Sequence, residues 1–176
     1  KVFWGLDDKL AFARHFPAIN WLTSYSLYQD VIDSYANDQL DKDWQQVRKR
    51  AMALLQREAE LEELVRLVGM DALAHEDRLL MQAAKMIRED FLHQNAFDER
   101  DSYTSLRKQL RLLKILLHYF DEVKAALKNG AALTQLLGVK ALDEIARAKL
   151  IPEDSNGEFV ALERKISAEI GAIQCG

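Results

Sequence analysis

Residues 41–68 read DKDWQQVRKRAMALLQREAELEELVRLV, and this stretch decides the fold. Its apolar side chains recur every three or four positions, which is the spacing of one face of an α-helix. We predict a single helix roughly 40 Å long, with Asp41 or Asp43 as its N-cap and Gly69 as its end. Its predicted inward side consists of Trp44, Val47, Ala51, Leu54, Leu55, Leu61, Leu64 and Val65.

Helical periodicity continues beyond this stretch, so we predict an all-α protein. Only 7 Gly and 2 Pro occur among 176 residues, which favours helix over sheet, and a chain of this length can bury one substantial core. The other predicted helices start at Ser24, near His75, at Thr104, in 132–148 and beyond Gly157. Their inward residues include Leu79, Leu80, Ala83, Ile87 and Phe91, then Leu106, Leu110, Leu113, Leu117, Phe120, Val123 and Leu127, and last Phe159, Leu162, Ile166 and Ile170.

The first 23 residues have a different character. Val2-Phe3-Trp4-Gly5 is a short β-prone run, and Pro17 disfavours a helical conformation at Phe16. No second convincing strand is evident, so we expect the pairing partner of this run to lie outside the chain. We therefore divide the chain into an extended segment, 1–23, and a helical domain, 24–176. The helix predicted from Ser24 carries one apolar stripe, made of Tyr25, Leu27, Tyr28, Val31, Ile32 and Tyr35.

Charge and composition exclude several classes of partner. The net charge is -4, and Lys and Arg are interleaved with acids, so we expect no nucleic-acid partner. No apolar run approaches the roughly 20 residues needed to cross a bilayer, and no signal peptide is evident. We therefore expect a cytoplasmic chain without direct membrane insertion. The single cysteine, Cys175, excludes an internal disulfide and is expected to be an inert thiol.

The sequence contains no recognisable catalytic motif. Gly138-Val139-Lys140 lacks both the upstream glycine and the following hydroxyl of a P-loop, so this chain alone should not hydrolyse ATP. The four histidines are scattered along the sequence, which argues against a metal site. Adjacent acids such as Glu62-Glu63 read as solvated helix surface. From residues alone, the chain is an acidic helical domain belonging to a larger protein.

Four stretches carry a resemblance to a known family. Residues 12–28, FARHFPAINWLTSYSLY, resemble the segment that joins the nucleotide-binding and C-terminal domains in catalytic A subunits of V-type (vacuolar or archaeal-type) ATPases. Residues 52–61, MALLQREAEL, and 89–99, EDFLHQNAFDE, are also similar to that subunit. Residues 2–7, VFWGLD, look like the last strand of its nucleotide-binding domain. The resemblance spans about residues 2–130 and implies a C-terminal helical bundle.

The resemblance implies an adenine pocket. In rotary ATPases the adenine ring lies between two aromatic side chains, and the matching positions here are Phe16 and Phe97. An aromatic clamp suits a flat purine, since stacking of a base on a ring is worth roughly 1–3 kcal/mol. Gln94, Asn95 and Ala96 are further candidates for this pocket.

The resemblance also implies a contact with the rotor. The turn after Gly69 is similar to the helix-turn-helix tip with which the related F-type catalytic subunit bears on its central shaft. A stiff helix pair could transmit closure of the nucleotide site to that shaft as a rigid-body movement. The candidate contact residues are Met70, Asp71, Ala72, Leu73, Ala74, His75, Glu76 and Asp77.

Family resemblance further implies what surrounds the chain. The parent subunit would hydrolyse or make ATP coupled to proton or sodium transport, with ATP or ADP and Mg²⁺ bound upstream of Lys1. Its partners would be B subunits in an alternating A3B3 ring and the central-stalk rotor subunits, in a cytoplasmic head peripheral to the membrane. No cofactor is expected on this chain by itself.

One alternative remains open from the sequence. The chain could be a stand-alone helical interaction module that binds a partner helix and has no nucleotide role. Such a module requires a self-sufficient N-terminus, whereas Val2-Phe3-Trp4 resembles a strand separated from its sheet.

Overall fold

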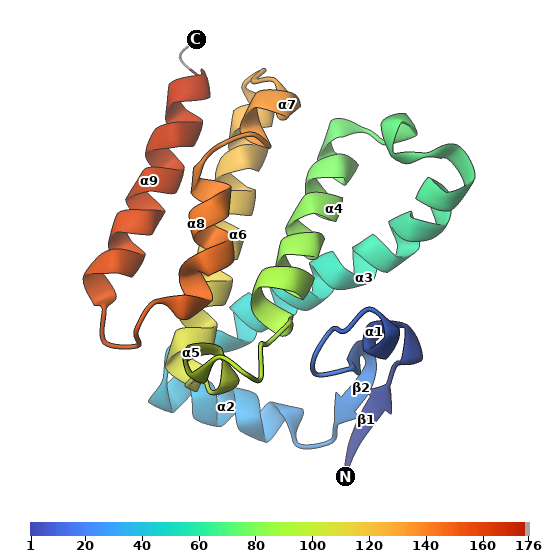
Figure 1. Cartoon of the computed structure of the whole chain (residues 1–176), viewed down its shortest axis with the longest axis vertical. Coiled ribbons are helices and arrows are strands. Elements are labelled where there is room, and N and C mark those ends of the chain that lie inside the picture. The colour runs from blue at the N-terminus through green and yellow to red at the C-terminus, as the bar shows by residue number, and fades with distance from the viewer. Residues whose placement is uncertain (175–176) are drawn as a thin grey trace.

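A computed structural model describes residues 1–174 and shows a helical protein with a small N-terminal hairpin (Figure 1). The all-α prediction is confirmed for the body of the chain. Cys175 lies outside the described residues. The helices are α1 (Asp8–Phe12), α2 (Gln29–Gln39), α3 (Trp44–Val68), α4 (His75–Met86), α5 (Glu99–Ser102), α6 (Leu106–Lys128), α7 (Leu133–Leu136), α8 (Ala141–Arg147) and α9 (Asn156–Gln174). Short 3₁₀ turns, η1 (Met70–Ala72) and η3 (Ala148–Leu150), and a π-helix, η2 (Ile87–Leu92), complete them.

The longest predicted helix is present as α3. The Asp41 carboxylate accepts a hydrogen bond from the Asp43 backbone at 2.9 Å, just before the helix begins. Gly69 ends it in a left-handed conformation, with φ of 83°. The prediction that Leu64 points inward is wrong, because its side chain is 43% exposed where α3 extends beyond the core. Five of the other predicted inward residues are buried: Val47, Ala51, Leu54, Leu55 and Leu61.

The N-terminal β-prone run has its partner within the chain, so the expectation of an external partner is wrong. Strand β1 (Val2–Leu6) pairs antiparallel with β2 (Ile19–Ser26), with Phe3 opposite Tyr25 and an irregularity before Gly5. The Phe3 and Tyr25 rings stack with centroids 5.6 Å apart. Sequence reasoning missed β2 because the spacing of its aromatic residues also fits a helix.

Helix α2 begins at Gln29, later than predicted, so Tyr25, Leu27 and Tyr28 of the predicted apolar stripe precede it, and the whole stripe is exposed. The residues it buries are Ala36 and Asp33. The Asp33 carboxylate receives hydrogen bonds from Arg48 Nη2 at 2.7 Å and from Trp44 Nε1 at 3.2 Å, which fixes α2 to α3. Burial alone would raise the pKa of Asp33, but hydrogen bonds led by Arg48 outweigh it and lower that pKa. The exposed stripe consists of Tyr25, Leu27, Tyr28, Val31, Ile32 and Tyr35.

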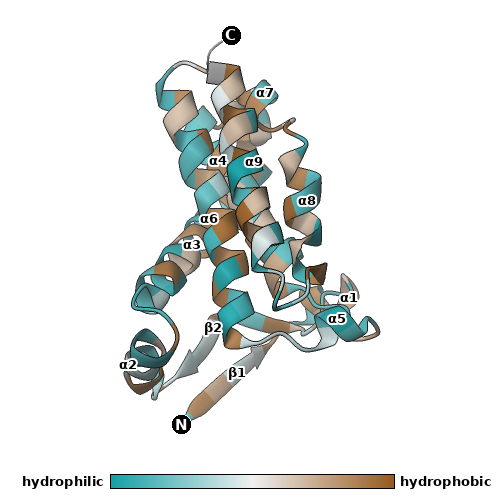
Figure 2. Cartoon of the chain, turned by 90° about the vertical axis from the view of Figure 1, so that its left-hand side faces the viewer, coloured by the Kyte–Doolittle hydropathy of each residue, from teal (hydrophilic) through white to brown (hydrophobic). Residues whose placement is uncertain are grey.

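The core lies between α6, α9, α4 and α3. The predicted inward residues of α9 are all buried, and most of those of α6 are buried or half-buried. Ser105, rather than Thr104, caps α6, because its hydroxyl accepts a hydrogen bond from the Lys108 backbone at 3.2 Å. Leu106, predicted to be inward, is 46% exposed because it lies in the first turn of that helix. Figure 2 shows apolar and polar residues alternating around these helices, and an apolar β1.

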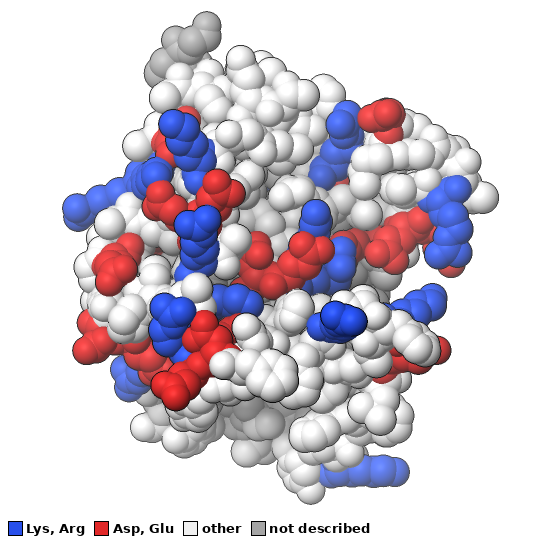
Figure 3. Space-filling view, in the orientation of Figure 1, with Lys and Arg blue, Asp and Glu red and all other residues white. Residues whose placement is uncertain are grey.

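Surface charge follows the expectation from the sequence on the face that Figure 3 shows. There the basic and acidic side chains are interleaved rather than gathered into one patch. None of the helices described in residues 1–174 combines the length and apolar character that crossing a membrane requires.

Candidate functional site

A cavity of about 580 Å³ lies where the N-terminal hairpin meets the loop that follows η2. We call it the aromatic cavity. All five residues predicted for the adenine pocket line it: Phe16, Gln94, Asn95, Ala96 and Phe97. The rest of its lining comes from the same loops, from α5 and from η3: Arg14, His93, Asp98, Asp101, Lys149 and Leu150. The structure therefore brings together residues that lie about 80 to 130 positions apart in the chain.

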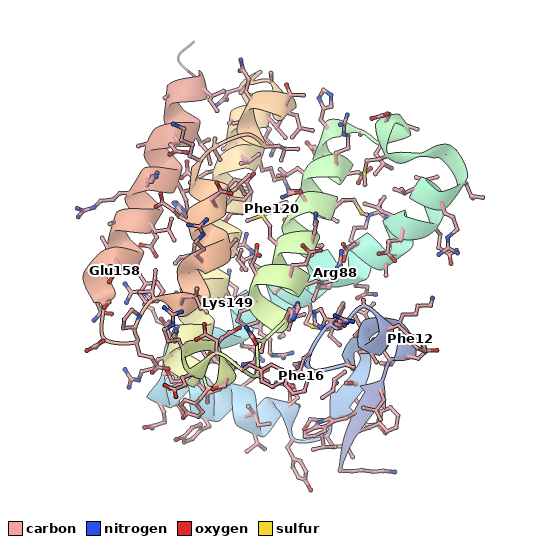
Figure 4. All side chains as sticks on the ribbon, viewed as in Figure 1. Phe12, Phe16, Arg88, Phe120, Lys149 and Glu158 are labelled. Atoms are coloured by element: carbon pink, nitrogen blue, oxygen red, sulfur yellow. The ribbon has the colours of Figure 1, made fainter. Side chains whose placement is uncertain are left out.

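Backbone hydrogen bonds join the two walls of the aromatic cavity. The Gln94 N–H donates to the Phe16 carbonyl at 2.7 Å. Next to Phe16, the His15 ring is buried, and its Nε2 lies 2.9 Å from the Arg88 carbonyl. Phe16 is thereby held against the end of η2, and Figure 4 shows Phe16 and Arg88 near the lower end of α4.

Both phenylalanine rings are accessible at the rim of the cavity. Phe97 is 99% exposed and Phe16 is 55% exposed, although large apolar side chains are usually buried. The Asn95 side chain accepts a hydrogen bond from the Phe97 backbone at 3.0 Å, so a local turn holds the exposed ring. Two free aromatic faces beside amide side chains are suited to stacking on, and hydrogen bonding with, a flat heterocycle.

Two histidines that looked scattered in the sequence lie close together, His93 in the lining of the cavity and His15 beside it. The rings of His15 and His93 lie with centroids 4.9 Å apart. Burial, followed by the charges of His15 and Lys149, lowers the pKa of His93. The His93 ring is therefore predominantly neutral at pH 7. In the described part of the chain, His, Cys, Asp and Glu side chains form no group of three or more that could hold a metal ion.

Sequence reasoning missed the charged residues of the cavity, and among them Asp101 and Lys149 form a pair. Their side chains are 4% and 19% exposed, and Lys149 Nζ lies 3.1 Å from Asp101 Oδ2. Lys149 lies in η3, beyond the region of family resemblance, and its spacing from the other lining residues carries no periodic signal. Only the folded arrangement reveals this pair.

The predicted rotor-contact residues form a separate site at the far end of the α3–α4 pair (Figure 1). We call residues 70–77 the tip segment. The Asp71 side chain is fully exposed, and Glu76 in the first turn of α4 is also exposed. Leu73 does not fit a contact role, because its side chain is only 6% exposed and anchors the turn. The outer surface of the tip segment is formed by Met70, Asp71, Ala72, Ala74, His75 and Glu76, with Asp77 half-buried.

Comparison with known proteins identifies the family. Residues 33–137 match the family described as the C-terminal domain of V and A type ATP synthase. The V-type ATP synthase alpha chain of Acetivibrio thermocellus is 52% identical over 174 residues, which is 98% of this chain and 30% of that protein. The alpha chain of Thermoanaerobacter pseudethanolicus is 50% identical over 177 residues, or 100% of this chain and 30% of that protein.

The chain belongs to the V- and A-type ATP synthase C-terminal domain family. It spans about 30% of the length of these curated relatives. Within the family match lie the tip segment and the loop that carries Phe97, whereas Phe16 and Lys149 lie outside it. The family resemblance identified from the sequence is confirmed.

Proposed function

We propose that this chain is the C-terminal part of the catalytic A subunit of a V-type ATPase or ATP synthase that transports protons or sodium ions. The support is the family match and the identity of about 50% with V-type ATP synthase alpha chains. In this proposal, residues 1–23 belong to the end of the nucleotide-binding domain and residues 24–176 form the helical domain. ATP or ADP with Mg²⁺ binds mainly in the rest of the subunit, in a cytoplasmic head peripheral to the membrane.

The aromatic cavity completes the adenine pocket of that subunit. The observation that carries this step is the meeting of Phe16 and Phe97, both exposed, at one cavity of about 580 Å³. A purine placed between them would cover two apolar surfaces that now face water. The phosphates need other residues, because the cavity offers only Arg14 and the Lys149 ammonium, which is already bonded to Asp101.

A nucleotide titration of the full-length subunit tests the adenine pocket. Phe16→Ala and Phe97→Ala should each raise the Kd for Mg-ATP about tenfold, the lower part of the range for stacking on an aromatic ring. Phe12→Ala is a matched control, because Phe12 is 86% exposed and does not line the cavity. An unchanged Kd in both cavity variants would remove the adenine assignment. Tight ATP binding by residues 1–176 alone would contradict the proposal that the phosphates bind in the rest of the subunit.

The tip segment contacts the central-stalk rotor in this proposal. Exposed apolar side chains lie at its start and just before it, since Met70 is 41%, Leu67 82% and Val68 54% exposed. Such a cluster is suited to packing against a partner more than to electrostatic attraction. The chain passes from the tip segment through α4 and η2 directly to the Phe97 loop. Movement at the nucleotide could therefore be transmitted along one helix pair.

Coupling in the assembled A3B3 ring with its rotor tests this contact. Leu67→Asp combined with Met70→Asp should lower ATP-driven ion transport severalfold and leave the Kd for Mg-ATP unchanged. Asp71→Asn with Glu76→Gln removes charge from the same region and should have little effect, if packing carries the contact. Unchanged ATP-driven ion transport in the variant with both Leu67→Asp and Met70→Asp would exclude the proposed contact surface.

The stand-alone interaction module remains the second hypothesis from the sequence. The pairing of β1 with β2 removes the argument that Val2-Phe3-Trp4 needs an external strand. Family membership is what favours the subunit of a rotary ATPase over that module.

A further inference from the structure

Lys149, in η3, bonds to two other residues that line the aromatic cavity, His93 and Asp101. Its ammonium donates to the His93 carbonyl at 3.0 Å and lies 3.1 Å from Asp101 Oδ2. His93 begins the loop that carries Phe97, and Asp101 lies in α5, the short helix that follows this loop. The Lys149 backbone is itself fixed, because Lys108 Nζ donates to the Lys149 carbonyl at 2.7 Å.

Asp101 in turn holds Gln94 and Asn95, which lie between His93 and Phe97 in the loop. Its Oδ2 accepts a hydrogen bond from the Asn95 N–H at 2.7 Å, and its carbonyl accepts one from Gln94 Nε2 at 3.3 Å. Asp101 is 2% exposed, so both bonds lie away from solvent, and the bond from Asn95 is charge-assisted because its acceptor is the carboxylate. Phe97, in contrast, is 99% exposed and receives almost no packing of its own. Its position depends on the backbone that Asp101 and Lys149 hold.

We propose that Lys149 is a positioning residue for base binding, acting through Asp101 and the His93 carbonyl to hold the Phe97 loop opposite Phe16. This inference rests on the proposed adenine pocket. A loop that is ordered before the ligand arrives loses less conformational freedom on binding, which raises affinity. Lys149 lies outside the family match, so the C-terminal segment of the chain takes part in forming the pocket.

Substitutions in the full-length subunit test this role. Lys149→Met keeps the apolar stem and removes the ammonium, whereas Lys149→Arg keeps the charge. Lys114→Met is the matched control, because Lys114 Nζ also has two oxygen partners, the carboxylates of Asp41 at 2.7 Å and Asp43 at 3.2 Å, but does not line the cavity. We would measure hydrogen exchange at the Asn95 amide, and the KM and kcat for Mg-ATP.

The expected result separates positioning from general stability. Lys149→Met should speed exchange at Asn95 and raise the KM about tenfold, as the loss of a charge-assisted hydrogen bond predicts, with kcat unchanged. Lys149→Arg should bring both the exchange rate at Asn95 and the KM close to those of the unaltered subunit. Lys114→Met should change neither quantity. Equal effects from Lys114→Met would overturn the inference, as would normal exchange at Asn95 in Lys149→Met.

The two proposals fail in different ways. If Phe16→Ala and Phe97→Ala raise the KM while Lys149→Met does not, the adenine pocket stands and the role of Lys149 is wrong. If Lys149→Met speeds exchange at Asn95 and none of the three variants alters the KM, the adenine pocket itself is wrong, and with it the role of Lys149 in base binding.

Discussion

The Arg88 guanidinium donates two hydrogen bonds to the carboxylate of Glu58, from Nε to Oε2 at 3.0 Å and from Nη2 to Oε1 at 3.0 Å. The pair joins η2 to α3 across 30 positions of sequence, and Glu58 is only 4% exposed. Burial raises the pKa of Glu58, against the hydrogen bonds and charge of Arg88, which lower it. Helix α3 and the π-helix that follows α4 are thus held together by an ion pair whose carboxylate is buried.

Removing one partner of this pair should be costly. Glu58→Ala leaves the Arg88 guanidinium without its carboxylate, and we expect the free energy of unfolding to fall by about 3–5 kcal/mol. Urea denaturation of the chain would measure it. Glu60→Ala is the control, because Glu60 forms only an exposed ion pair with Arg57 and should cost below about 1 kcal/mol. A loss that small for Glu58→Ala would contradict a structural role for the pair.

Asp90 should make stability depend on pH. Burial, and then the neighbouring Glu89, raise its pKa from 3.8 to about 6. Between these two values the folded chain holds a proton that the unfolded chain has released, so the free energy of unfolding falls as pH rises through this window. Asp90→Asn should therefore stabilise the chain by about 3 kcal/mol at pH 7.5 and by less than about 1 kcal/mol at pH 4.

Denaturation at both pH values checks the Asp90 prediction. Glu89→Gln removes the neighbouring charge but leaves Asp90 buried, so it should raise the free energy of unfolding at pH 7.5 by less than Asp90→Asn does. An equal gain from Asp90→Asn at pH 4 and pH 7.5 would show that ionisation of Asp90 is not its source.

Gly69 should be irreplaceable at the start of the tip segment. Its φ of 83° and ψ of 161° fall in a region that is essentially restricted to glycine. A Cβ there would meet no atom within 4 Å, so the cost of Gly69→Ala, about 1–3 kcal/mol, comes from the backbone alone. Gly157→Ala is the matched control, with equally open surroundings and no positive φ. Thermal unfolding of both variants tests this, and equal midpoints would contradict it.

Gly5 should be needed for a steric reason instead. A Cβ at Gly5 would lie 2.3 Å from Thr23 Oγ1 and 3.3 Å from Thr23 Cβ, across the β1–β2 pair. Gly5→Ala should therefore loosen the hairpin, seen as faster hydrogen exchange in residues 2–26. Thr23→Ala in the same chain should restore part of the protection, because it removes the closest atom. Exchange in Gly5→Ala that matches the unaltered chain would show that the hairpin adjusts without loss.

The sequence predicted the long helices well because their apolar residues follow one period and lie in a shared core. Leu54 on α3, Leu113 on α6 and Ile166 on α9 show this agreement. The same reasoning failed for the stripe from Tyr25 to Tyr35, since periodicity identifies an apolar face and cannot tell what covers it. It also placed Leu64 in the core, although α3 had already passed beyond its packing partners there.

For the candidate site, the prediction depended on family resemblance rather than on residue chemistry. Phe16 and Phe97 do meet at one cavity, but neither residue stands out from the other phenylalanines by spacing. The Asp101–Lys149 pair could not be predicted, because a contact formed through an irregular loop produces no periodic spacing in the sequence. The His15–His93 contact was missed for the same reason.

The π-helix η2 has a geometric consequence for the aromatic cavity. Its wider turn is closed by the His93 N–H bonding to the Arg88 carbonyl, five positions back, at 3.0 Å. Such a turn accommodates one residue more than an α-helix would over the same rise. Deleting a single residue within 87–92 would let α4 continue as a regular helix, and everything after it would rotate by about 100°. The orientation of Gln94 towards Phe16 therefore depends on a one-residue difference in chain length.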